Sequence, residues 1–123
     1  MTSDSKKSIS VLIVDDETLA REGIRMVLDK DPHIRSVHEA KDGKEALQSL
    51  RVHKPDVVFM DVQIPEMSGF EVLQNANMER LPVIVFVTAY DKYAIEAFEV
   101  QAVDYVLKPV SYTHLTLPTI LLV

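Results

Sequence analysis

Short apolar segments recur along the chain, and each is too short to form an ordinary helix. The clearest is Asp56–Asp61, whose centre, Val57–Met60, is wholly apolar and whose last residue is a carboxylate. Apolar runs of this length indicate strands that are buried on both faces of a sheet. Three segments have this character: Ile9–Val14, Asp56–Asp61 and Val83–Val87. Val103–Leu107 is a further predicted strand, interrupted by Asp104.

The segments between these strands carry helix signals. Apolar residues at helical spacing predict an amphipathic helix over roughly Thr18–Asp29. Asp42 and Ser68 each stand three residues before a glutamate, which is typical of helix starts, and Asp91 is placed to cap a further helix. Ile34–Ala40 mixes apolar and polar residues and is predicted to be an edge strand.

Strands and helices alternate along the whole series, which indicates an α/β layer fold with parallel strands and right-handed crossovers. We expect a flavodoxin-like, doubly wound, five-stranded parallel sheet with strand order 2-1-3-4-5. The 123 residues are the size of one domain. The predicted domain covers residues 9–110, after a disordered N-terminal segment at 1–8 and before a tail at 111–123.

Composition removes several classes of function. The chain has no cysteine, which excludes disulfides and thiolate metal sites. The formal net charge of -6 disfavours direct binding to nucleic acid. No apolar run approaches the ~18 residues that span a membrane, and the polar N-terminus does not resemble a signal peptide. A cytoplasmic domain without membrane contact is expected.

Polar residues follow directly on the ends of the apolar strands: Asp15 and Asp16, then Asp61, Thr88 and Lys108. In open parallel sheets, ligands bind outside the carboxyl ends of the strands, where the strand order reverses. In the order 2-1-3-4-5, the first and third strands are neighbours at that point. The three aspartates are therefore expected to lie side by side.

The charges of these residues predict a metal site. Two carboxylates ~4 Å apart repel each other by ~4 kcal/mol at an effective dielectric of about 20, and one lysine does not balance three of them. A divalent cation does, and an all-oxygen site suits Mg²⁺. Thr88 and Lys108 can then bind an oxyanion, which is what phosphoryl transfer requires. A carboxylate among them is a known type of nucleophile.

These residues resemble the motif set of the response-regulator receiver domain of two-component signalling. The resemblance covers about Ile9 to Pro109 and rests on four motifs: Val14-Asp15-Asp16-Glu17, Met60-Asp61 followed by Pro65 and Gly69, Thr88-Ala89, and Lys108-Pro109. It implies that Asp61 accepts a phosphoryl group from a sensor histidine kinase. It also implies that the protein is no enzyme beyond catalysing its own phosphoryl transfer and autodephosphorylation.

The same resemblance assigns the other roles. It implies a Mg²⁺ site made by Asp15, Asp16 and Asp61 with the backbone carbonyl of Gln63. It implies that Thr88 and Lys108 bind the phosphoryl oxygens, that Tyr105 is a switch aromatic that responds to Thr88, and that the Lys108-Pro109 bond is cis. All residues assigned a role follow: Asp15, Asp16, Asp61, Gln63, Thr88, Tyr105 and Lys108.

A finer resemblance, to receivers of the LytTR (LytR/AlgR-type) group, rests on Ala89–Ala94, Ala97–Glu99 and Asp104–Pro109. It implies transcription regulation through a DNA-binding domain that is absent from this sequence, with no nucleic-acid contact by the chain itself. A homodimer through the fourth helix and the fifth strand is a further expected partner.

The tail departs from the family pattern. Threonines and Pro118 disfavour the long final helix that the family has, so that helix is expected to be missing or replaced. Residues 111–123 look like translated vector or adapter sequence rather than native protein. Losing a helix that covers ~400 Å² of apolar sheet removes ~10 kcal/mol of burial, which predicts poor solubility or dimerisation.

Two other functions fit the strand-end residues less well. An aspartyl-phosphate-forming phosphohydrolase of the haloacid-dehalogenase type needs a second acid two residues after its nucleophile, where this chain has Gln63. An FMN-binding module needs a phosphate loop rich in Ser, Thr and Gly after the first strand, where Asp15-Asp16-Glu17 would repel the phosphate. The phosphorylation-dependent switch is the favoured interpretation.

Overall fold

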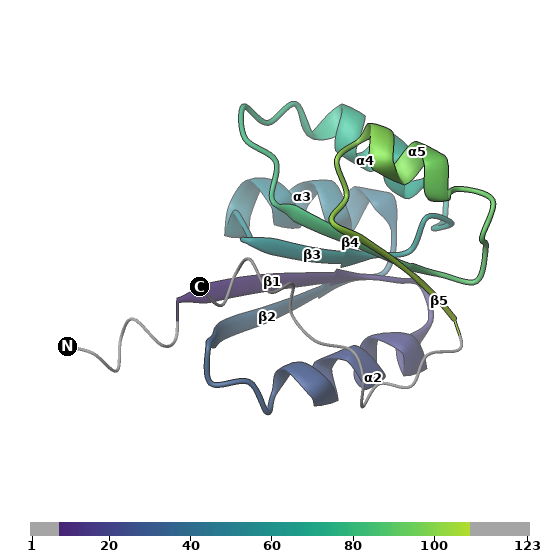
Figure 1. The fold of residues 1–123 in the computed structure, drawn as a ribbon. Coiled ribbons are helices and arrows are strands. Elements are labelled where there is room, and N and C mark those ends of the chain that lie inside the picture. The colour runs from purple at the N-terminus through teal and green to yellow at the C-terminus, as the bar shows by residue number, and fades with distance from the viewer. Residues whose placement is uncertain (1–7, 109–123) are drawn as a thin grey trace.

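The computed structural model describes residues 8–108, and that part of the chain contains five strands alternating with four helices (Figure 1). The elements in chain order are β1 (Ile9–Val14), α2 (Thr18–Leu28), β2 (Ile34–Ala40), α3 (Gly43–His53), β3 (Val57–Met60), α4 (Gly69–Ala76), β4 (Val83–Thr88), α5 (Ala94–Glu99) and β5 (Asp104–Leu107).

The strands form one sheet with the order β2-β1-β3-β4-β5, and every neighbouring pair is parallel. This confirms the predicted flavodoxin-like fold. The chain moves from β1 to β2 on one side and then returns to place β3 on the other side. The strand order therefore reverses between β1 and β3, where a ligand site is expected.

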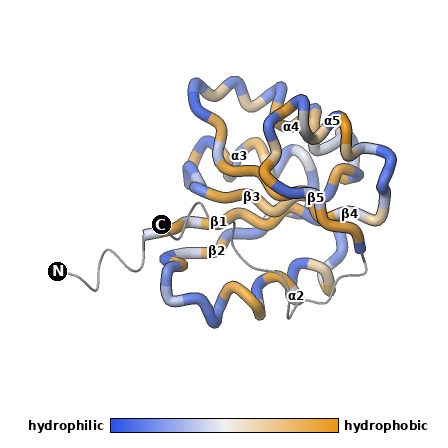
Figure 2. The backbone as a smooth tube through the Cα atoms, viewed as in Figure 1, coloured by the Kyte–Doolittle hydropathy of each residue, from blue (hydrophilic) through white to orange (hydrophobic). Residues whose placement is uncertain are grey.

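Helices cover both faces of the sheet: α2 lies on one face, and α3, α4 and α5 lie on the other (Figure 1). The strands β1, β3 and β4 are mostly hydrophobic, whereas the edge strand β2 mixes hydrophobic and hydrophilic residues (Figure 2). Each face has its own apolar cluster, with Leu12 and Phe86 among the buried residues of one and Phe59 and Ile24 among those of the other. Burial on both faces explains why β1, β3 and β4 read as continuous apolar runs.

Side-chain caps fix the starts of two of the four helices, α3 and α4. The Asp42 carboxylate accepts a hydrogen bond from the Glu45 N–H at 2.8 Å, and Ser68 forms a complete capping box with Glu71. Both caps were predicted. The helix after β4 begins at Ala94, three residues beyond Asp91, whose backbone carbonyl accepts from the Ala94 N–H.

Several predictions fall on residues that lie outside the described part of the chain. They concern residues 1–7 of the segment predicted to be disordered (1–8), the cis bond before Pro109, the missing or replaced last helix, and the tail at 111–123. They stay predictions. Within residues 8–108, each helix is too short and too polar to cross a membrane.

Candidate functional site

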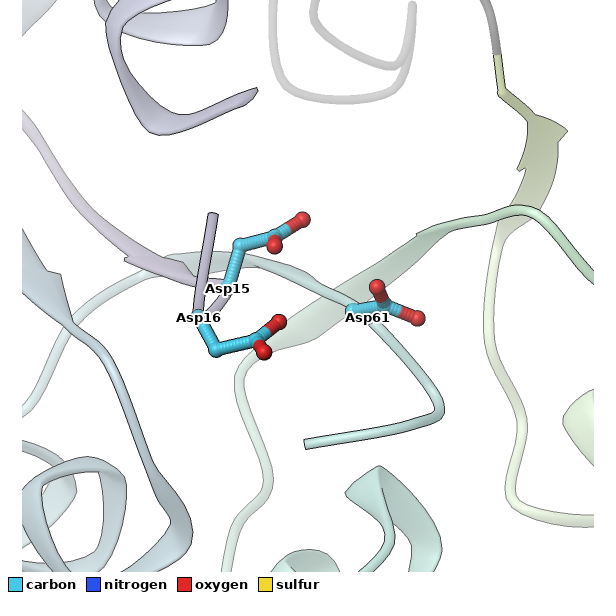
Figure 3. A group of neighbouring side chains, drawn as sticks. All are labelled: Asp15, Asp16 and Asp61. Carbon is cyan, nitrogen blue, oxygen red and sulfur yellow. The ribbon is translucent and has the colours of Figure 1, made fainter. Parts of the chain in front are cut away.

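Three carboxylates meet at the point where the strand order reverses. Asp15 and Asp61 directly follow the neighbouring strands β1 and β3, and the Asp61 N–H donates to the Val14 carbonyl at 2.9 Å. With Asp16, they offer ligand oxygens that all lie within 4.8 Å of one another. The carboxylates gather in one place at the ends of these strands (Figure 3).

Asp15 is the buried member of this cluster. Its side chain is 2% exposed, and its Oδ1 accepts a hydrogen bond from the Glu17 N–H at 2.9 Å. Its Oδ2 lies 2.8 Å from the ammonium of Lys108, close enough for an ion pair, but it accepts no hydrogen bond from the described residues. The Lys108 ammonium therefore offsets the charge of this buried oxygen.

Burial raises the pKa of Asp15 above its ordinary value, although Lys108 and the Glu17 N–H both oppose this shift. The negative charge of Asp61 raises it further. Burial and the neighbouring charge of Asp61 thus disfavour the ionised form of Asp15.

Lys108 is the cation that the cluster already holds. Its Nζ lies 2.6 Å from Glu17 Oε1, 2.8 Å from Asp15 Oδ2 and 3.0 Å from Asp61 Oδ2. Burial alone would lower the pKa of Lys108, but contacts with these three carboxylates outweigh it and hold the pKa above its ordinary value. The side chain is therefore a fixed positive charge beside Asp61.

Asp61 is itself buried, at 6% exposure. Its Oδ1 accepts a hydrogen bond from the Gln63 backbone N–H at 3.1 Å, and its Oδ2 accepts one from Lys108. Both oxygens are thus oriented by positive or partly positive groups.

Next to Asp61 the surface opens into a cleft of about 530 Å³. Its lining residues are Asp16, Glu17, Asp61, Gln63, Ile64, Pro65, Ala89, Tyr90 and Lys108. Thr88, at the end of β4, is fully buried and is not among them, and its Oγ1 accepts from the Tyr90 N–H at 3.4 Å. Half-buried Tyr105 donates its hydroxyl to the Tyr90 carbonyl.

The structure therefore brings together most of the residues singled out in the sequence. Asp15, Asp16, Asp61 and Lys108 form one cluster, and Gln63 borders it. Thr88 and Tyr105 do not line the cleft, and each is hydrogen-bonded to the backbone of Tyr90.

Three contacts were not predicted. Glu17 binds Lys108, Arg21 donates to the Asp15 carbonyl at 2.7 Å, and Tyr93 accepts from the Gln63 side chain at 2.8 Å. The position of Glu17 directly after Asp15 and Asp16 was the one sequence feature that could have indicated its contact with Lys108. No sequence pattern pointed to Arg21 or to the Tyr93 contact.

A flavodoxin-like sheet with an acidic cluster and a lysine where its strand order reverses is the arrangement expected of a receiver domain. Comparison with known proteins is consistent with that class. Residues 11–118 match the family described as the response regulator receiver domain. The chain belongs to this family.

Two curated relatives are similar over most of the chain. One is the transcriptional regulatory protein BtsR of Salmonella typhi, 47% identical over 107 residues, or 87% of this chain and 45% of the relative. The other is the sensory transduction protein LytT of Bacillus anthracis, 45% identical over 82% of this chain and 42% of the relative. They confirm the resemblance to the LytTR group. The chain spans less than half the length of these relatives.

Solved structures agree with the fold. The response regulatory domain of MrkE from Klebsiella pneumoniae superposes with a TM-score of 0.77 at 36% identity, covering 85% of this chain and 87% of that one.

Proposed function

We propose that this receiver domain is a phosphorylation-dependent switch in which Asp61 accepts a phosphoryl group from a sensor histidine kinase. One observation carries the proposal: the Asp61 carboxylate lies 3.0 Å from the Lys108 ammonium and within 4.8 Å of two further carboxylates. A nucleophile, a metal-binding set and a fixed cation thus lie together at one site.

Mg²⁺ is the metal proposed for this site. The donor set is all oxygen, from Asp15, Asp16 and Asp61 with the Gln63 carbonyl as a further ligand, and hard divalent cations prefer such ligands. Three carboxylates whose oxygens lie within 4.8 Å of one another, with one lysine among them, leave negative charge that a divalent cation would offset. When bound, the metal would neutralise charge on the phosphoryl oxygens.

The protein's own residues then have separate tasks. An Asp61 oxygen attacks the phosphorus while the bond from phosphorus to the donor breaks. Lys108 exchanges a contact with a carboxylate for one with a phosphoryl oxygen, where its charge offsets the charge of the transferring group. Thr88 supplies a hydroxyl donor if it turns from its buried position toward the cleft.

The proposed output begins at Thr88 and Tyr105. A movement of Thr88 would loosen Tyr90, to which both Thr88 and Tyr105 are hydrogen-bonded. This would bias the surface of α5 and β5, through which a homodimer is proposed. In the whole protein we propose that this regulates transcription through a separate DNA-binding domain in the cytoplasm, with no direct nucleic-acid contact by the receiver.

The domain is proposed to turn over no substrate other than its own phosphoryl group. A phosphohydrolase of the haloacid-dehalogenase type would need an acid where Gln63 stands, and the relatives favour the switch.

The test is to mix the protein with Mg²⁺ and a small acyl-phosphate donor and to measure intact mass. Wild type should gain one phosphoryl group, and Asp61→Asn should gain none. Equal labelling of both would rule out Asp61 as the acceptor. Steady turnover of an unrelated phosphoester would favour the phosphohydrolase.

A further inference from the structure

The backbone of Gln63 contacts the acceptor Asp61, but its side chain is hydrogen-bonded to a distant part of the chain. Its backbone N–H donates to Asp61 Oδ1, while its Nε2 donates to the hydroxyl of Tyr93 at 2.8 Å, 30 residues further along the chain. Gln63 is exposed and lines the cleft beside Asp61. The side-chain amide of Gln63 thus belongs to a residue that lines the cleft, but it is hydrogen-bonded to Tyr93 in the loop before α5.

Tyr93 is a well-held anchor for this amide. Its ring packs edge-on against Tyr90 at 6.0 Å and tilted against Phe70 at 6.2 Å, measured between ring centroids. The Lys92 ammonium lies 5.2 Å from the centre of the same ring. Because the ring of Tyr93 is held by its packing against Tyr90 and Phe70, its hydroxyl can hold a surface glutamine at little additional cost in conformational entropy.

The amide matters because the phosphoryl group must be lost by hydrolysis. A water oxygen bonds to phosphorus, the bond from phosphorus to the Asp61 oxygen breaks, and its electron pair returns to the carboxylate. Both protons of the water leave with inorganic phosphate. A glutamine amide beside such a site can orient the attacking water, which speeds this step.

We propose that Tyr93 is a positioning residue that holds the Gln63 amide away from the attacking water and so prolongs the lifetime of the phosphoryl group on Asp61. This inference rests on the function proposed above. It assigns a kinetic role to a hydrogen bond outside the acid–lysine cluster, and it links the lifetime to the loop that leads into α5.

Tyr93→Phe tests the proposal because it removes the hydroxyl and keeps the ring. Both proteins are labelled with Mg²⁺ and a small acyl phosphate, the donor is removed, and the decay of the phosphorylated mass is followed. Loss of the phosphoryl group should be at least about fivefold faster in Tyr93→Phe, as expected for the release of one hydrogen bond. An unchanged lifetime would overturn the inference.

A double-mutant cycle separates the amide from general effects of the loop. In a Gln63→Ala background, which keeps the backbone carbonyl, Tyr93→Phe should cause no further change in lifetime. The same acceleration with and without Gln63 would overturn the proposal. Lys92→Gln, which removes the cation over the ring and leaves the hydroxyl, is the matched control and should decay like wild type.

Nuclear magnetic resonance gives a readout that needs no phosphorylation. The side-chain NH₂ signals of Gln63 should shift in Tyr93→Phe and stay in place in Lys92→Gln; signals unmoved in both would overturn the inference. If wild type takes up no phosphoryl group at all, the proposed function fails and the inference fails with it. Normal labelling with equal decay rates refutes the inference alone.

Discussion

Lys108 is the residue on which the resting site depends most. It contacts three carboxylates, from two strand ends and the start of α2, at 2.6–3.0 Å. It is also 87% buried at the side chain, so its charge is little screened by solvent. The same ammonium therefore stabilises the unphosphorylated cluster and is available for a phosphoryl oxygen.

Lys108→Met should slow labelling by a small acyl phosphate about 100-fold, the order of effect seen when one charge-stabilising group is removed from an active site. Mg²⁺ affinity, measured by titration calorimetry, should be retained or tightened because a competing cation is gone. Lys44→Met, an exposed change of the same charge on α3, should behave like wild type. Labelling of Lys108→Met at the wild-type rate would contradict this role.

Glu39 shows how a residue of the edge strand secures α2. It pairs with Arg21 at 2.8 Å and with Arg25 at 2.7 Å. Burial alone would raise the pKa of Glu39, but the two arginines outweigh it and lower the pKa below its ordinary value. A carboxylate with a lowered folded-state pKa adds stability that is present at neutral pH and disappears in acid.

Glu39→Gln should lower the free energy of unfolding by about 1 kcal/mol at pH 7, since the pairs are partly exposed. The difference from wild type should be fully present above the ordinary glutamate pKa of about 4.3 and vanish as the pH falls through the lower folded-state value. Denaturant titrations at pH 7 and at acidic pH measure it, with exposed Glu22→Gln as control. A difference that persists in acid would contradict the mechanism.

The helix α4 begins in close contact with the backbone of the acceptor. Gly69, its first residue, lies so close to β3 that an added Cβ would be 2.8 Å from the Asp61 carbonyl oxygen and 2.8 Å from Met60 Sδ. Backbone cannot yield as a flexible side chain can. The start of α4 therefore fixes the backbone that carries Asp61.

Gly69→Ala should lower the free energy of unfolding by about 1–3 kcal/mol through overpacking. Gly43→Ala is the comparison, because it also stands first in its helix but its Cβ would meet only side-chain atoms of Met67, the nearest at 2.4 Å, which a change of rotamer can move. Gly43→Ala should lower the free energy of unfolding by less than Gly69→Ala does, as measured by denaturant unfolding. Equal losses would show that the Asp61 carbonyl contact has no special weight.

The elements themselves could be predicted from the sequence, because burial of both sheet faces leaves a strong apolar pattern. β1 and β2 have the predicted bounds, and the Asp42 and Ser68 caps were found from spacing alone. Contacts between side chains that are far apart in the sequence could not be predicted. Glu17 and Lys108 are 91 residues apart, and only the assembled sheet shows that they meet.

At the scale of the whole molecule, the acidic cluster stores repulsion that metal binding would relieve. The net charge of -6 adds to that repulsion. Folding and metal binding should therefore be linked, because Asp61 is brought next to Asp15 and Asp16 only when the sheet is assembled.

Mg²⁺ at about ten times its dissociation constant should stabilise wild type by about 1.4 kcal/mol and raise Tm by roughly 5 °C. Asp16→Asn should melt higher than wild type without metal, since one repulsive charge is gone, and should show no rise with Mg²⁺. Calorimetric melting curves with and without the metal decide this. An equal rise in both proteins would place the Mg²⁺ elsewhere.

The most direct test of the account is to find which residue carries the phosphoryl group. After labelling with Mg²⁺ and an acyl-phosphate donor, hydroxylamine converts an aspartyl phosphate into a stable hydroxamate, which peptide mass spectrometry can locate. The account predicts the hydroxamate at Asp61 and at no other carboxylate. A hydroxamate at Asp15 or Asp16, or a phosphoryl group found on a histidine, would contradict it.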